Sequence, residues 1–386
     1  MNKKMIKFKI SAPGEIILSG EHTVMFGKHF VVAGLDLRTN LEFCELSDEQ
    51  TNIRIEFQDY EKDVPLQEVQ YLFFRLIREN LFSDQVNLLK KVDSFIDVNN
   101  MWEKPEEKIS LQMFFFLLFI IIYDMEHEVK PFRLRVSTEI PFGDCFGSST
   151  SFAVCLAACF LRWKRLQSGD YIRFNEQDLQ KIEHYTKSCE NIMVYSTFKP
   201  LDAKVCIYGS INKCISNNYQ SCSIEGTINL TTGMKILLID THRLQSDKYS
   251  IYLQMLELKY FRPSYFNSIL NDLEKIATRI FNDLYNINNN IKDPDAYSNL
   301  QRDIKRNQQM LSRYDLSYFE FDIITCLGGG FNLSGKLTGF GGRYVYFLLP
   351  PRITQEEIKR ITNFFSYRRC SYKIATIGCD GVRIDI

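Results

Sequence analysis

The stretch EIPFGDCFGSST, residues 139–150, lies between a predicted strand and a predicted helix. Residues 131–141 alternate apolar and polar side chains, which indicates a strand with one buried face. Residues 148–166 are small or apolar to an unusual degree and include no glycine or proline, which favours a buried helix that begins at the serines. The start of such a helix presents unpaired N–H groups and the positive end of a dipole, and both suit an anion. The stretch therefore predicts a phosphate-binding loop, whose small residues are Gly143, Gly147, Ser148 and Ser149.

The size and charge of the chain narrow the possible functions. Its 386 residues are enough for two domains with cores of their own. Lysine plus arginine and aspartate plus glutamate both number 47, so the formal net charge is zero. Because nucleic acids and anionic membranes favour a basic excess, we expect neither as a partner.

The apolar segments and the cysteines indicate where the protein resides. The most apolar run, residues 111–123, is shorter than the roughly 20 residues of a membrane span, so we expect a helix buried inside a domain. The 11 cysteines are scattered without a CxxC pair, and the N-terminus lacks the apolar stretch of a secretory signal. These features predict reduced thiols in the cytoplasm and disfavour a structural zinc site.

The remaining periodic segments mix strands and helices, which is typical of an α+β or an α/β protein. Apolar patterns predict strands within 6–10, 29–46 and 233–241 and helices at 176–193 and 266–284. The polar segment 286–299 predicts a loop, and a helix over about 300–313 follows it. A Ser/Asn/Thr-rich stretch near 215–232 suggests two domains, residues 1–225 and 226–386.

Two further clusters of small residues accompany the opening stretch. They are SAPGEIILSGEHTVMFGK, residues 11–28, and KLTGFGGRY, residues 336–344. None of the three clusters is a Walker A loop, because GxxxxGK[ST] is absent. One glycine-rich loop is a weak indication of a nucleotide site, whereas three in this order are a much stronger one.

At these clusters the sequence resembles the GHMP kinases, and within them the mevalonate kinase family. The clusters are similar to that family's APGKxxLxGEHxVxxGxxA, PxGxGLGSSAA and KLTGAGGGGC signatures. NQQMLSRYDLS (307–317) and IATIGCDGVRI (374–384) are similar to two further family motifs. The resemblance implies a two-domain α+β fold with the active site in the cleft between the domains. It also implies ATP-dependent phosphorylation of the 5-hydroxyl of mevalonate, an early step towards isoprenoids and sterols, and a homodimer is common in the family.

The resemblance assigns the binding of ATP and Mg²⁺ to named residues. The second cluster would surround the phosphates with backbone N–H groups. Ser149 would offer its hydroxyl to Mg²⁺, although a serine there can also be a plain helix N-cap. Glu190, in CENIMVY, matches the family's metal-binding glutamate, and the alternative is an exposed helix acid. Gly339, Gly341 and Gly342 of the third cluster would support the phosphate side of the cleft, unless they form only a tight turn.

The resemblance also assigns the residues around the substrate. Asp202, in FKPLDAKVCIYGS, falls on the family's catalytic base, because it precedes Gly209 by the family spacing. Further positions match family residues beside the substrate. A structural histidine and a tight turn are the alternatives for His22 and Thr338. The predicted substrate-binding residues are Glu21, His22, Thr241, Lys336 and Thr338.

The sequence departs from the family pattern where the chemistry would occur. Glu15 stands where the family has a lysine that stabilises negative charge, so we expect an acid facing the phosphates across the cleft. Lys204 or Lys199, beside Asp202, would then supply a positive charge from another direction. These changes keep two alternatives open. One is a catalytically impaired GHMP-fold protein that binds a metabolite or a partner, and the other is a kinase for another hydroxylated small molecule.

Overall fold

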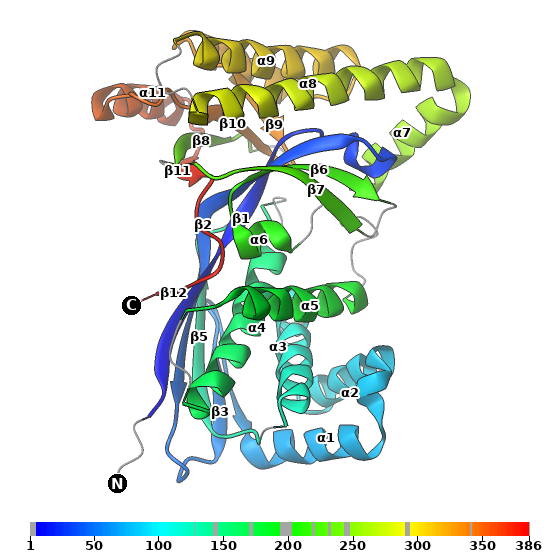
Figure 1. Ribbon diagram of the computed structural model, residues 1–386, viewed down its shortest axis with the longest axis vertical. Helices are drawn as coiled ribbons and strands as arrows, with labels where there is room; N and C mark the ends of the chain where they lie inside the picture. Colours follow the sequence, from blue (N-terminus) through cyan, green and yellow to red (C-terminus); the bar gives the residue numbers. More distant parts are fainter. Residues whose placement is uncertain are drawn as a thin grey trace.

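The computed structural model describes residues 5–126, 128–141, 146–169, 173–193, 203–217, 221–230, 233–242, 248–289, 294–339 and 342–385. Strands from all parts of these ranges form one sheet of twelve strands (Figure 1). The strands are β1 (Lys7–Ser19), β2 (His29–Glu45), β3 (Asn52–Glu56), β4 (Glu61–Pro65), β5 (Phe132–Thr138), β6 (Ile211–Asn217), β7 (Ser221–Ile228), β8 (Met234–Asp240), β9 (Gly335–Thr338), β10 (Tyr344–Leu348), β11 (Tyr372–Ile377) and β12 (Arg383–Asp385).

β2 is the strand on which the rest of the sheet is built. Residues 29–33 of β2 pair with β6, residues 39–45 pair with β5, and β1 runs antiparallel along most of the strand. In between, Leu35 pairs with Ile377 of β11, and β11 leads through β8 and β10 to β9. One strand therefore connects the two halves of the molecule, and β12 returns from the C-terminal half to pair with β1.

Helices cover the two halves of the sheet separately. In Figure 1, α1 to α6 lie together beside β1, β2, β3 and β5, whereas α8, α9 and α11 lie at the opposite end around β8 to β10. The helices are α1 (Leu66–Arg78), α2 (Gln85–Val98), α3 (Pro105–Asp124), α4 (Ser148–Gln167), α5 (Glu176–Ile192), α6 (Lys204–Tyr208), α7 (Lys248–Phe261), α8 (Pro263–Asn289), α9 (Pro294–Arg313), α10 (Phe319–Gly329) and α11 (Gln355–Tyr367), with short 3₁₀ turns η1 (Val24–Phe26) and η2 (Leu81–Ser83).

α3 forms the centre of the N-terminal core. Its residues from Leu111 to Ile122 are apolar apart from Gln112 and at most 6% exposed, because α2, α4 and α5 surround the helix. The buried helix predicted at 111–123 is therefore confirmed. Across the described ranges, no helix combines the length and apolar character needed to cross a membrane.

The helix predicted after the opening stretch is confirmed, since α4 begins at Ser148. The patterns at 176–193, 233–241 and 266–284 likewise correspond to α5, β8 and α8. The loop predicted over 286–299 is wrong at both ends, because α8 continues to Asn289 and α9 already begins at Pro294. The boundary between residues 225 and 226 falls within β7 and stays a prediction.

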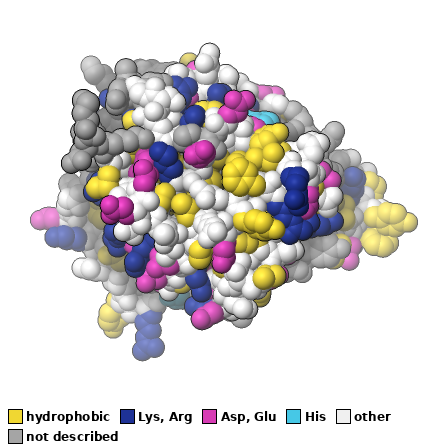
Figure 2. Space-filling view, turned by 90° about the horizontal axis from the view of Figure 1, so that it is seen from below, with side chains coloured by type: hydrophobic (Ala, Val, Ile, Leu, Met, Phe, Trp, Pro, Cys, Tyr) yellow, Lys and Arg dark blue, Asp and Glu magenta, His cyan; other side chains and the backbone are white. Residues whose placement is uncertain are grey.

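The surface at the α1 end mixes side chains of every type. Figure 2 views the molecule from this end and shows acidic and basic side chains interspersed, with small apolar patches between them. α1 contributes two of the exposed aromatic side chains, Tyr71 and Phe74. On the face in view, no large area carries charges of one sign only.

Candidate active site

The N-terminus of α4 has the geometry expected of an anion-binding turn. Gly147 is the N-cap residue and has a φ of 69°, a left-handed conformation that favours glycine. Ser148 is half-buried and Ser149 is exposed, so the first turn is reachable from solvent. α4 spans 20 residues and has no acidic residue in its first turn. Because its N-cap residue is Gly147, no capping side chain accepts a hydrogen bond from its first N–H groups. Its N-terminal N–H groups and its dipole therefore favour a negative charge supplied from elsewhere.

Glu190 is one source of that charge. It lies in the last turn of α5, and its carboxylate accepts a hydrogen bond of 2.7 Å from the Thr150 hydroxyl in the first turn of α4. The half-buried Glu190 thus contacts the turn that carries Ser149, which is more than the exposed helix acid weighed as the alternative. The sequence analysis missed Thr150, although it directly follows Ser149.

A magnesium ion at this turn would need further oxygen ligands beyond the protein side chains. Ser149 and Glu190 offer oxygen atoms, which Mg²⁺ prefers. Among the described residues, no group of three or more His, Cys, Asp or Glu side chains is arranged to hold a metal ion. Phosphate oxygens and water would therefore complete the coordination, as they commonly do for Mg²⁺.

Glu15 does not face the helix from across a cleft, as the sequence suggested, but packs directly against it. Its backbone N–H donates to the Phe146 carbonyl at 3.0 Å, and its side chain is 3% exposed. A Cβ atom placed on Gly147 would lie 2.7 Å from the Glu15 Cγ and 2.9 Å from its Oε1. Burial, together with the nearby charges of Glu15 and Glu190, raises the pKa of the Cys206 thiol well above its ordinary value. Glu15 lies close to the first turn of α4 through its contact with Gly147, and Glu190 does so through Thr150.

Lys204 contacts a carboxylate of α5. Lys204 is the first residue of α6, and its ammonium is 3.7 Å from Glu183 of α5. Glu183 precedes Glu190 by two helical turns, which is about 10 Å along the axis. The role of Lys204 as a substitute cation stays a prediction. Asp202, Gly143, Gly341 and Lys199 lie outside the described residues.

Three of the predicted substrate-binding residues form a buried cluster with one another. The Lys336 ammonium donates to Glu21 Oε1 at 2.5 Å and to the Leu337 carbonyl at 2.7 Å. His22 Nδ1 is 3.4 Å from the same Glu21 oxygen. All three side chains are at most 3% exposed. Burial alone would raise the pKa of Glu21, but Lys336 and His22 lower it to about 2, so the Glu21 carboxylate is ionised at neutral pH. Burial lowers the pKa of Lys336, and Glu21 opposes this effect.

The other predicted residues of the third cluster hold strands together. The Thr338 hydroxyl donates to the Ile17 carbonyl at 2.9 Å, and Gly339 follows with a φ of 79°. Thr241 donates from its hydroxyl to the Arg343 carbonyl at 2.7 Å, and Gly342 beside it is buried. These contacts fix the end of β9 against β1 and the end of β8 against β10.

Two large side chains connect the second cluster to the third. The rings of Phe146 and Tyr344 meet edge to face with their centroids 5.2 Å apart. Arg343 contacts Asp240, which is 2% exposed, at 2.7 Å. Phe146 and Tyr344 are far apart in the chain, so the sequence alone could not show that their rings pack together.

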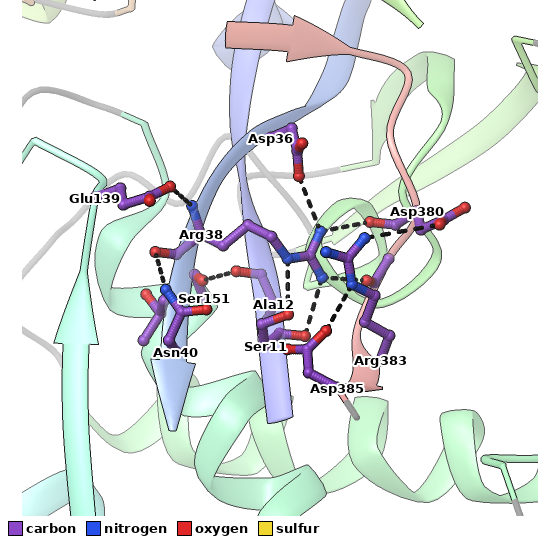
Figure 3. Close-up of polar contacts among 12 residues, drawn as sticks. Ser11, Ala12, Asp36, Arg38, Asn40, Glu139, Ser151, Asp380, Arg383 and Asp385 are labelled. Carbon is purple, nitrogen blue, oxygen red and sulfur yellow. Dashed lines mark hydrogen bonds and ion pairs between the residues drawn. The ribbon is translucent and has the colours of Figure 1, made fainter. Parts of the chain in front are cut away.

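A buried arginine connects the first cluster to the C-terminal motif (Figure 3). Arg38 of β2 donates to the Ser11 hydroxyl at 2.8 Å and to the carbonyls of Asp380 and Gly381 at 3.0 and 2.7 Å. Gly381 in turn packs on α6, where a Cβ atom would lie 1.9 Å from the Ile207 carbonyl oxygen. The motif at 374–384 therefore supports the helix that follows the predicted base in sequence.

Comparison with known proteins extends the resemblance over the chain. No protein-family model matches it. Mevalonate kinase from Homo sapiens is 24% identical over 389 residues, which cover 97% of this chain and 94% of the human one. The structure of the Methanococcus jannaschii mevalonate kinase matches with a TM-score of 0.66 and 15% identity over 98% of this chain and 99% of that one. The structure of L. major mevalonate kinase in complex with R-mevalonate matches with a TM-score of 0.65 and 12% identity over 97% of both chains.

These matches confirm two predictions. The chain has the two-domain α+β fold of the GHMP kinases. The relatives by sequence and by structure described above are mevalonate kinases, the family that the motifs resemble.

Proposed function

We propose that this protein is an ATP-dependent small-molecule kinase that phosphorylates the 5-hydroxyl of mevalonate. The observation that carries the proposal is the first turn of α4, where Gly147, Ser148 and Ser149 begin a long helix beside Glu190. Phosphoryl transfer depends mainly on positioning and on neutralising charge, and this turn offers both N–H groups and oxygen ligands. The relatives named mevalonate kinase favour mevalonate as the substrate.

The residues divide the work as follows. Backbone N–H groups at the start of α4 would bind the ATP phosphates, and Ser149 and Glu190 would hold Mg²⁺. When bound, Mg²⁺ neutralises charge on the transferred phosphoryl group. Asp202 accepts the proton of the substrate hydroxyl. The buried cluster of Glu21, His22 and Lys336 fixes the strand ends that border the substrate.

A coupled ADP-release assay with mevalonate, ATP and Mg²⁺ tests the proposal. The parent protein should release ADP only when mevalonate is present, and Asp202→Ala and Glu190→Gln should each lower kcat by 100-fold or more, on the order expected for groups at the reacting phosphoryl. A fully active Asp202→Ala variant would remove Asp202 as the base. ADP release with another hydroxylated compound, and not with mevalonate, would identify a different substrate.

An impaired protein that only binds a metabolite is the second candidate, and the buried acid at Glu15 favours it. A thermal shift separates the two, because a ligand that binds only the folded state raises the melting temperature. A shift with ATP–Mg²⁺ but no turnover would support the second candidate. We also propose a cytoplasmic location and a homodimer. Size-exclusion chromatography with light scattering tests for the dimer.

A further inference from the structure

The α8–α9 helix pair carries a cavity that the candidate active site does not use. The two helices pack side by side (Figure 1), and an open cavity of about 260 Å³ lies between them. Pockets for drug-sized ligands begin at roughly 300 Å³, so this cavity suits a smaller ligand. Its lining consists of Asp272, Arg306, Gln309, Met310, Arg313 and Tyr314.

α9 presents two arginines to the cavity. Arg306 and Arg313 are seven residues apart, which is about two helical turns or about 10 Å along the axis, so they share a face with Gln309 between them. Both arginines are exposed. Across the part of the chain that the structure describes, neither guanidinium forms an ion pair or a hydrogen bond. Their N–H donors are therefore available to an anion that lies between them.

The opposite face of α9 is fixed in place by buried polar contacts. Asn307 donates from its side chain to the Ser19 hydroxyl at 2.5 Å, and the Gln308 carbonyl oxygen accepts from the Leu337 N–H at 2.9 Å. Both α9 side chains are buried. The arginines thus project from a helix that is already held against β1 and β9, which lowers the cost of ordering them around a ligand.

Asp272 adds a hydrogen-bond acceptor to the cavity. The Tyr314 hydroxyl donates to Asp272 Oδ2 at 3.0 Å, and the rings of Tyr314 and Tyr265 meet edge to face with their centroids 6.0 Å apart. These contacts hold the carboxylate and the ring at one end of the cavity, and a carboxylate has further lone pairs for a hydroxyl group. Two arginines against one aspartate leave the lining with a net positive charge. A matching ligand combines an anionic group with a hydroxyl.

We propose that this cavity binds a small hydroxylated phosphate monoester, at a site separate from the ATP site proposed above. The phosphate group lies between Arg306 and Arg313, because guanidinium groups bind phosphate through paired hydrogen bonds and a dianion can engage both. The Gln309 amide donates to the same group. A hydroxyl of the ligand donates to Asp272, and its carbon atoms lie beside Met310.

The methyl group of Met310 provides a direct measurement, because this side chain lines the cavity. Protein labelled with ¹³C at its methionine methyl groups is titrated with glycerol 3-phosphate and, separately, with inorganic phosphate, and Met310→Leu assigns the signal. The Met310 signal should shift and saturate with both probes. The Kd should be about threefold or more lower for glycerol 3-phosphate, on the order expected for one additional hydrogen bond. The signal of Met101, buried in the N-terminal core, should not move.

Substitutions of the charged residues test their roles. Arg306→Gln and Arg313→Gln should each raise the Kd of both probes about tenfold, on the order of a lost hydrogen bond to a charged group. Arg78→Gln is the matched control, because it removes an exposed arginine of α1, and it should leave the Kd unchanged. Asp272→Asn removes the charged acceptor and should reduce the preference for glycerol 3-phosphate over inorganic phosphate.

The site is overturned if the Met310 signal of the parent does not shift in a saturable way, or if both arginine variants keep the parent's Kd. Equal affinities of the parent for the two probes would overturn the hydroxylated class of ligand. Phosphate that binds only at the first turn of α4 would leave the dependence on Arg306 and Arg313 absent. Because the measurement needs no turnover, this site can stand while the kinase proposal fails, and the reverse.

Discussion

Replacing Lys336 by methionine should destabilise the protein far more than replacing the whole ion pair. Lys336→Met leaves the Glu21 carboxylate buried at 1% exposure without its ammonium partner. Removing one member of a buried pair typically costs about 3–5 kcal/mol, whereas replacing both is often nearly neutral. The lowering of the Glu21 pKa from 4.5 to about 2 corresponds to about 3 kcal/mol of interaction, which agrees with the lower end of that range. Glu21→Gln with Lys336→Met should therefore cost about 1 kcal/mol or less.

Chemical denaturation at several pH values provides the assay. Because the pKa of Glu21 is lowered in the folded state, its contribution to stability is complete above about 4.5 and is lost as the pH falls towards 2. At pH 7 the parent should be at least as stable as the double variant. Between pH 7 and pH 2 the free energy of unfolding of the double variant should rise by about 3 kcal/mol relative to that of the parent. A single variant no less stable than the double variant at pH 7 would refute the reasoning, because it would show that the carboxylate does not depend on Lys336.

Further predictions concern the contacts that surround the site. Gly381→Ala should lower both stability and kcat, because its Cβ would lie 1.9 Å from a carbonyl oxygen of α6. The control Gly329→Ala in α10 places a Cβ that meets nothing within 4 Å and should change little. Equal melting temperatures for the two variants would exclude the close approach at Gly381. Phe146→Leu and Tyr344→Leu should show a coupling of about 0.5–1.5 kcal/mol in a double-mutant cycle of unfolding, and additive effects would mean that the rings do not interact. Arg38→Lys should cost 2 kcal/mol or more in denaturant unfolding, on the order expected when buried acceptors lose a fork of donors, and an unchanged midpoint would contradict the network.

Local patterns predicted those parts of the fold that depend on local physics. Residues 148–166 combine serines at the start with small apolar residues, so the position of α4 and its buried face were both predictable. The order of the three motifs along the chain then predicted the fold, and the similar structures confirm it. The asparagine-rich segment after residue 285 was predicted as a loop because asparagine favours turns, but α8 extends through part of it.

The contacts that define the candidate site could not be predicted, because they join residues far apart in the chain. Lys336 and Glu21 are 315 positions apart, and each alone looked like a residue that would bind substrate. Glu15 was recognised as a reversed charge, but only the structure shows which helix it contacts. A burial pattern along one segment gives the depth of a side chain, whereas the identity of its partner depends on the tertiary fold.

The pairing of β12 with β1 has a consequence for how the protein is made. Domains usually fold as they emerge during synthesis, with the N-terminal part first. Here residues 9–11 of β1 acquire their β12 partner, and Arg38 acquires two of its carbonyl acceptors, only once residues 380–385 have been synthesised. The half of the molecule that leaves the ribosome first therefore waits for a late segment before its sheet is complete, and truncation before residue 380 should impair the earliest part of the fold.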